Sequence, residues 1–120
     1  MKQLTRAEEQ VMKVVWKTNG GLLMEIVESM PEPKPHKNTV ATILKGLVEK
    51  GYIRVENLGR IHRYHPAVGI DEYSKYSLSN LAKGYFDNSY RNVVSFLVEK
   101  NGLSIEDLEM LLQQLKKDKA

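Results

Sequence analysis

The chain of 120 residues contains no cysteine, and this absence excludes several kinds of chemistry. Disulfide bonds, cysteine-type zinc sites and thiol catalysis all need that side chain. Long apolar runs are also missing: stretches such as Gly21-Leu22-Leu23-Met24 fall far short of the roughly 20 residues that a membrane-spanning helix needs. The start, residues 1–6, has no apolar segment of the kind found in secretory signals, so we expect a cytoplasmic protein.

Motifs of catalysis and cofactor binding are absent as well. The sequence has no glycine-rich phosphate loop, no G-x-S-x-G and no H-E-x-x-H. His62 and His65 are three positions apart on a predicted strand, which places them on opposite faces, so they cannot share a metal ion. We therefore expect neither an enzyme nor a cofactor or metal site.

Positive charge, in contrast, is concentrated between residues 34 and 65. That window has seven lysines and arginines and two glutamates, a formal charge of +5, while the rest of the chain carries −2 and the whole chain +3. All three histidines lie in the same window. Because a small DNA-binding domain presents a basic surface to phosphates, this clustering indicates a nucleic-acid partner.

Residues 1–68 have the element order of a winged helix-turn-helix domain. Thr5 and Glu8 have the spacing of a capping box, which predicts the start of a first helix. This helix is expected to end at residues 19–21. A second helix follows up to Pro31, and a third runs from about 36–38 to Lys50. A strand at 52–56, a tight turn at 57–59 and a return strand at 60–65, ended by Pro66, predict a β-hairpin.

Residues 69–120 are predicted to be helical. Helices are expected from Asp71, from 87 to 100 and after a cap at Ser104, with a break at Asn101-Gly102. The predicted fold class is therefore mainly α with a small β-hairpin: a winged helix-turn-helix domain followed by a C-terminal helical region. Because so short an appendage needs a partner to cover its apolar stripes, we expect a homodimer. The expected dimer contacts are Tyr85, Val94, Leu97, Leu108, Leu111, Leu112 and Leu115.

The outward face of the third helix and the hairpin are the candidate DNA-binding surface. A helix fits the major groove, where Asn pairs with adenine, Thr and Ala methyl groups meet the thymine methyl, and Lys suits guanine or phosphate. Arginines beside a tight turn can hold phosphate or enter a narrow minor groove. Small side chains, Gly46 among them, are expected to let the helix sit deep. The candidate residues are Lys37, Asn38, Thr39, Ala41, Thr42, Lys45, Arg60, His62 and Arg63.

Three segments carry a resemblance to a known family. Leu4-Thr5-Arg6-Ala7-Glu8, with Val11-Met12 and Val15-Trp16, resembles the opening of the penicillinase repressor family of the BlaI/MecI/CopY type. Asn38-Thr39-Val40, with Leu47 and Lys50-Gly51-Tyr52-Ile53, is similar to its recognition helix and the entry to its wing. Val98-Glu99-Lys100 followed by Leu103-Ser104 is similar to its C-terminal region, so the resemblance covers nearly the whole chain.

The resemblance implies a homodimeric repressor that binds a palindromic operator, with 37–45 as the reader, 60–63 as the wing and the tail as the dimer region. Some members are inactivated when a membrane sensor metalloprotease triggers cleavage of an Asn-Phe bond in the tail. Aligned on 98–100, that bond corresponds to Phe96-Leu97, where the asparagine is not kept. The copper-responsive branch uses a C-terminal cysteine cluster, which this chain lacks. The alternative hypothesis is a winged-helix module that docks a protein and binds no specific DNA.

Overall fold

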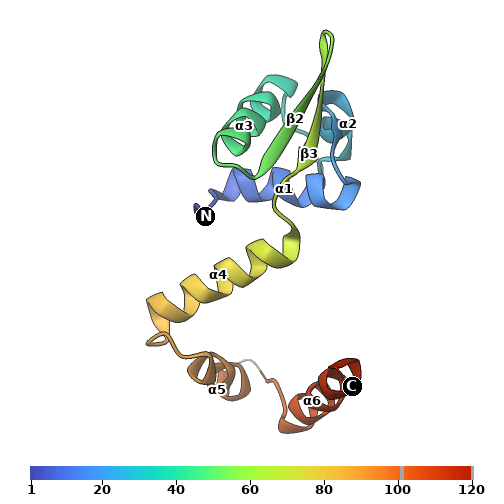
Figure 1. Cartoon of the computed structure of the whole chain (residues 1–120). Coiled ribbons are helices and arrows are strands. Elements are labelled where there is room, and N and C mark those ends of the chain that lie inside the picture. The colour runs from blue at the N-terminus through green and yellow to red at the C-terminus, as the bar shows by residue number, and fades with distance from the viewer. Residues whose placement is uncertain (101, 120) are drawn as a thin grey trace. The chain divides into compact units, whose positions relative to one another are not determined.

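The computed structural model describes residues 1–100 and 102–119 and consists of two compact units. Unit 1 is Met1–Tyr76, and unit 2 begins at Ser77. In chain order the elements are α1 (Arg6–Thr18), β1 (Gly21–Leu22), α2 (Leu23–Ser29), α3 (Lys37–Glu49), β2 (Ile53–Leu58), β3 (Ile61–Pro66), α4 (Ile70–Tyr85), α5 (Tyr90–Lys100) and α6 (Ile105–Lys119) (Figure 1). This is the predicted mainly helical winged-helix architecture.

The first helix begins at the predicted capping box. The Thr5 hydroxyl accepts a hydrogen bond from the Glu8 amide, and the Glu8 carboxylate accepts one from the Thr5 amide at 2.8 Å. At the other end Asn19 takes a left-handed conformation with φ 57°, as a residue that closes a helix often does. Both ends of α1 therefore follow from local side-chain chemistry.

A small antiparallel sheet has the strand order β1-β3-β2. The register pairs Asn57 with His62 and Leu58 with Ile61, so the prediction of a turn at 57–59 was wrong: the turn is Gly59-Arg60. Gly59, at the first turn position, has φ 72°, a conformation that glycine adopts without strain. β3 begins and ends one residue later than the predicted strand: Arg60 lies in the turn, and Pro66, which was predicted to end the strand, is its last residue and pairs with Ile53.

The two-residue strand β1 was not predicted, because Gly21 belongs to a sequence pattern that is typical of the end of a helix. Gly21 pairs with Tyr64 and Leu22 with Arg63. The chain reaches this position only because Gly20 has no side chain: a Cβ there would lie 2.1 Å from the Tyr64 carbonyl oxygen, and Gly20 has φ 88°. The local signal for a helix end therefore also encodes a close backbone approach.

The core of unit 1 lies where α1, α2, α3 and the sheet meet. The apolar stripe of α3 is buried as predicted, through Val40, Leu44 and Leu47. Tyr52 is fully buried, its hydroxyl donates to the Lys2 carbonyl oxygen, and burial raises its pKa to about 12. The other buried members are Leu4, Val11, Met12, Val14, Val15, Ile26, Val27, Met30, Ile53 and Tyr73.

The first turns of α4 belong to this core. The Tyr73 ring lies 5.6 Å from the Tyr52 ring and 5.8 Å from the Trp16 ring, measured between centroids. The Tyr73 hydroxyl donates to the Glu9 carboxylate at 2.7 Å, and the Trp16 indole donates to the Val68 carbonyl at 2.8 Å. Unit 1 therefore extends past residue 68 because an aromatic cluster fixes the start of α4 to α1.

Unit 2 is the remainder of α4 with α5 and α6. The predicted start of α5 at Asp87 was wrong: Asp87 and Asn88 both have positive φ, and the helix begins at Tyr90. The Ser89 hydroxyl accepts from the Asn92 amide at 3.1 Å. Ser104 likewise accepts from the Asp107 amide at 3.0 Å, as predicted for α6. The predicted break at Asn101 lies outside the described residues.

Candidate nucleic-acid interface

The start of the basic helix α3 is fixed by a histidine. The His36 Nδ1 atom accepts a hydrogen bond from the Asn38 amide at 3.0 Å, so His36 is the N-cap of α3. Sequence reasoning had assigned no role to this side chain. The signal was its place directly after Pro35, since the first helical amides need an acceptor. The cap orients the first turn of α3, which contains Lys37, Asn38 and Thr39.

The predicted reading residues of α3 form one outward face. Five of the six are exposed and Ala41 is half-buried. The Thr42 hydroxyl donates to the Asn38 carbonyl at 3.0 Å, so its methyl group is the part left for an external partner. The exposed residues of this face are Lys37, Asn38, Thr39, Thr42 and Lys45.

The cations of the basic window divide into two groups. Lys34 pairs with Glu28 at 3.1 Å, and Lys50 pairs with Glu8 at 2.6 Å. Within the described part of the chain, the others have no carboxylate within ion-pair distance. These are Lys37, Lys45, Arg54, Arg60 and Arg63. Among the described residues of this window, the unpaired positive charge is therefore carried by α3 and the hairpin, the two elements that a winged helix presents to DNA.

The hairpin separates the predicted wing residues onto two faces. Because paired residues of antiparallel strands share a face, His62 lies on the face of Asn57, Val55 and Tyr64, whereas Arg63 lies on the opposite face. Arg60 is in the turn itself. In Figure 1, β2 and β3 rise between α3 and α2, and the turn projects beyond both helices.

One cavity lies between α3 and the hairpin. It measures about 320 Å³, and it is lined by Ala41, Lys45 and Val48 from α3 and by Val55, His62 and Tyr64 from the sheet. Of the predicted site residues, the cavity brings His62 together with Ala41 and Lys45, which lie 21 and 17 positions before it in the sequence. Arg63 is not part of it.

The face of the hairpin that carries Arg63 also holds a paired carboxylate. His65 contacts the Glu56 carboxylate at 2.9 Å. This hydrogen bond, with the nearby charges of His65, Arg54 and Arg63, holds the pKa of Glu56 below its usual value. Glu56 therefore stays ionised to lower pH than an isolated glutamate, and its charge offsets part of the arginine charge on this face.

Gly46 lies beside Glu8 of α1. A Cβ at this position would lie 3.4 Å from the Glu8 carboxylate, which is an ordinary contact distance. Glu8 in turn pairs with Lys50, and this ion pair links the first turn of α1 to the end of α3. That Gly46 lets the helix sit deep in a groove stays a prediction.

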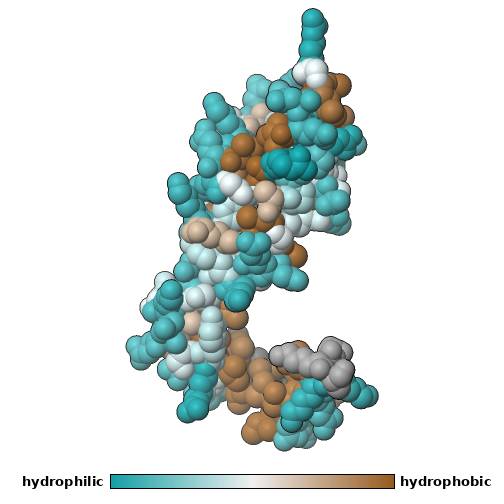
Figure 2. All heavy atoms as spheres, viewed as in Figure 1, coloured by the Kyte–Doolittle hydropathy of each residue, from teal (hydrophilic) through white to brown (hydrophobic). Residues whose placement is uncertain are grey.

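In unit 2 the predicted dimer residues lie largely at the surface. Tyr85, Val94, Leu111, Leu112 and Leu115 are exposed, and Leu97 and Leu108 are half-buried. Figure 2 shows hydrophobic side chains gathered over α5 and α6 on the visible side. At the predicted cleavage position, Phe96 is exposed in α5 and its ring lies 5.5 Å from that of Phe86.

Among the residues that the structure describes, no group of three or more His, Asp or Glu side chains could hold a metal ion. None of the described helices is both long and apolar enough to cross a membrane.

A winged helix with unpaired cations on its third helix and its hairpin, followed by a helical unit rich in exposed apolar side chains, defines this protein as a winged helix-turn-helix protein with a C-terminal helical region. A sequence model described as penicillinase repressor matches residues 4–117, which is nearly the entire chain. The chain belongs to the penicillinase repressor family.

Individual relatives are distant in sequence. The chain is 25% identical over 118 residues to the penicillinase repressor of Bacillus licheniformis, covering 98% of this chain and 92% of that protein. It is 24% identical over 116 residues to the methicillin resistance regulatory protein MecI of Staphylococcus aureus strain N315, covering 96% and 94%. A solved CopR repressor structure has 33% identity and a TM-score of 0.46, covering 54% of this chain and 96% of that one.

Proposed function

We propose that this protein is a homodimeric transcriptional repressor that binds a palindromic DNA operator in the cytoplasm. The observation that carries the proposal is the placement of the unpaired cations of the basic window on α3 and the hairpin, beside a shared cavity. Two relatives are named as a penicillinase repressor and as a methicillin resistance regulator, which supports the same class of function.

The reading role is assigned to α3. Its N-terminal turn would enter the major groove, where Asn38 is suited to adenine, and the methyl groups of Ala41 and Thr42 to thymine. Lys45, further along the same face, is suited to guanine or phosphate. Lys37 and Thr39 flank this row, and we assign them contacts to the sugar–phosphate backbone of the DNA.

The hairpin supplies the wing. Arg60, in the projecting turn, has no ion pair in the described part of the chain and is placed to contact phosphate or a narrow minor groove. His62 faces α3 across the shared cavity. We assign it a contact to the DNA backbone at the point between α3 and the hairpin. Arg63, on the other face near Glu56, is assigned a longer-range electrostatic contribution.

Dimerisation is assigned to the tail, 69–120, and DNA binding to 1–68. The exposed leucines of α6 and the exposed side chains of α4 and α5 would be covered by a second copy, because such apolar area is costly to leave in water. Two-fold symmetry would place two copies of α3 one or two DNA turns apart, at about 34 Å per turn, and so require a palindrome.

Release of the operator is proposed to follow cleavage of the tail under the control of a membrane sensor protease. The corresponding bond, Phe96-Leu97, lies within α5, so this helix would have to open locally before a protease could accept it. Phe86 stacks edge-on against Phe96 and would oppose that opening. Removal of the residues after Phe96 would leave monomers that bind one half-site each.

Selection of bound duplexes from a random DNA pool tests the proposal most directly. We expect enrichment of a palindrome whose half-sites are one or two turns apart. Affinity for that site should fall with salt, with a slope of log K against log salt of about −0.9 for each phosphate neutralised. A pool that yields no enriched sequence, with no retardation of any duplex in dilute buffer, would contradict the proposal and favour the protein-docking alternative.

A further inference from the structure

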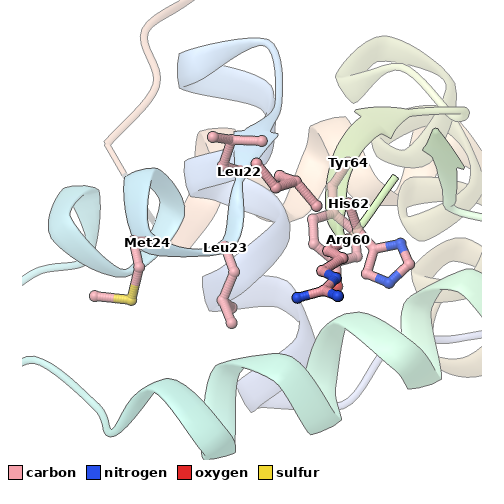
Figure 3. A pocket seen from close by; sticks show the side chains of 7 residues that line it. Leu22, Leu23, Met24, Arg60, His62 and Tyr64 are labelled. Atoms are coloured by element: carbon pink, nitrogen blue, oxygen red, sulfur yellow. The ribbon is translucent and has the colours of Figure 1, made fainter. Parts of the chain in front are cut away.

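A second cavity lies between the start of α2 and the hairpin; it shares His62 and Tyr64 with the first cavity, but none of its lining residues comes from α3. Its volume is about 310 Å³. Figure 3 shows Leu22, Leu23 and Met24 on one side and Arg60, His62 and Tyr64 on the other; Ile61 completes the lining. This volume is at the lower end of the range of small-molecule sites, about 300–1,000 Å³.

The cavity exists because β1 is short. β1 pairs only with Arg63 and Tyr64, and the chain turns into α2 at Leu23. β3, however, continues toward the hairpin turn as Ile61 and His62, paired with β2 on its other side. The part of β3 beyond the end of β1 therefore faces the first residues of α2 across a space that no strand of the described chain fills.

The chemistry of the lining is strongly asymmetric. Leu22, Leu23, Met24 and Ile61 provide an apolar surface, with Met24 and Ile61 about half exposed at 50% and 53%. The polar groups come from the hairpin, and Arg60 is the one permanently charged group among the lining residues. Among the described residues, no carboxylate lines the cavity: the nearby Glu25 carboxylate instead accepts from the Leu22 amide at 2.7 Å. An occupant with an apolar body and one anionic group matches this arrangement.

We propose that this cavity binds a small apolar carboxylate, one or two rings in size, with its carboxylate on Arg60. A guanidinium suits a carboxylate because its N–H groups form a planar fork. A consequence, which rests on the proposed function, is competition: a ligand that holds Arg60 in the cavity removes it from DNA. Bound ligand would then lower the affinity for DNA, and bound DNA would lower the affinity for the ligand by the same factor.

The test is a titration of the full chain, followed by amide NMR shifts, with 2-naphthoate and with its uncharged counterpart 2-naphthamide. We expect naphthoate to shift the amides of 22–24 and 60–64, and naphthamide to bind at least tenfold more weakly, because a charge-assisted hydrogen bond is lost. Equal binding of both compounds, or shifts centred on unit 2, would overturn the proposal.

Two pairs of variants sharpen this test. Arg60→Gln should weaken naphthoate binding about tenfold or more, whereas Arg54→Gln, on the same hairpin but outside the cavity, should leave it unchanged. Met24→Glu should weaken it through charge repulsion more than Met24→Gln, and both should fold, because Met24 is half exposed. Equal affinity for naphthoate in Arg60→Gln and Arg54→Gln would count against the site.

The pocket and the repressor function can fail separately. Retardation of the selected duplex without added ligand tests the function, and naphthoate shifts on the DNA-free chain test the pocket. If naphthoate binds the cavity but leaves the affinity of the duplex unchanged, the predicted competition is wrong. If the duplex binds but naphthoate produces no shift at the cavity, the pocket proposal is wrong and the repressor function stands.

Discussion

Glu8 and Lys50 form an ion pair of 2.6 Å that joins the first turn of α1 to the end of α3. The Lys50 ammonium also donates to the Gln3 carbonyl at 3.3 Å. Both side chains are largely shielded, with 12% of Glu8 and 24% of Lys50 exposed. The pair therefore fixes the position of the proposed reading helix on the helix beneath it.

Acid should weaken this contact in a defined direction. Partial burial alone would raise the pKa of Glu8, but hydrogen bonds from Lys50 and Thr5 outweigh it and hold the pKa below the usual value of a glutamate. The stabilisation is therefore complete above about pH 4.5 and is lost as the pH falls through the lower, folded-state pKa. Glu8→Gln should lower the free energy of unfolding at pH 7 by about 1 kcal/mol.

Urea unfolding followed by Trp16 fluorescence measures this effect, with the exposed Glu49→Gln as control. The difference between wild type and Glu8→Gln should shrink as the pH falls through the lowered pKa of Glu8, because below it residue 8 is uncharged in both proteins. A difference that is constant from pH 7 to pH 3 would contradict the assigned role of the carboxylate.

The N-cap of α3 should be replaceable by another acceptor. His36→Ala removes the Nδ1 atom that accepts from Asn38 and should cost about 1 kcal/mol, whereas His36→Asn should restore most of it, because asparagine is a strong N-cap. Urea unfolding of the three proteins checks the order. Equal stability of the alanine and asparagine variants would show that the cap contributes nothing.

Gly20 and Gly59 should respond differently to alanine, although both have positive φ. At Gly20 the added methyl group meets the Tyr64 carbonyl at 2.1 Å, so Gly20→Ala should cost more than about 2 kcal/mol and disturb β1. At Gly59 the space is open, and Gly59→Ala should cost only the backbone strain, about 1 kcal/mol. Thermal unfolding compares them, and a smaller loss at Gly20 would refute the close-approach argument.

Lys45 and Arg60 should have separable effects on DNA binding. Lys45→Ala should change which base is preferred at one position of each half-site and cost about 1–3 kcal/mol there. Arg60→Ala should weaken all duplexes alike and reduce the salt slope by about 0.9 per subunit. Fluorescence anisotropy on the selected site and its single-base variants measures both. Unchanged affinity in both variants at moderate salt would exclude this interface.

Leu112 tests the proposed dimer contact. It is 56% exposed in the single chain, so Leu112→Lys should leave the chain folded but place a charge in the subunit interface and dissociate the dimer. Gln113→Lys, at the next and also exposed position, is the matched control. Light scattering gives the mass. Wild-type mass in the Leu112 variant would move the interface elsewhere.

The helices of unit 1 could be predicted from the sequence because their signals are local. Thr5 and Glu8, which are three residues apart, form a capping box that predicts the start of α1. The stripe through Val40, Leu44 and Leu47 predicts the buried face of α3. The hairpin turn could not be placed correctly, because Asn57 and Leu58 have turn and strand propensities that only the cross-strand register decides.

The rest of the site depends on contacts between distant residues. β1 needs Tyr64 as a partner, and which residues of β2 share a face with His62 and with Arg63 follows from the register of the hairpin. The cap by His36 is local, but histidine is an uncommon choice, and ordinary cap rules favour Ser, Thr, Asp or Asn. The apolar cavity beside Arg60 exists only once β1 and α2 are packed against β3.

The position of Tyr73 determines whether the amino-terminal fragment would stay folded after cleavage in α5. Because its ring closes the aromatic cluster of unit 1, a chain broken in α5 retains every side chain that this cluster needs. The amino-terminal fragment would therefore stay folded and keep its fit to a half-site. It would lose avidity, since two tethered readers bind far more tightly than one. Proteolysis of the tail would in this way inactivate the protein by separating the two subunits, without unfolding the amino-terminal unit.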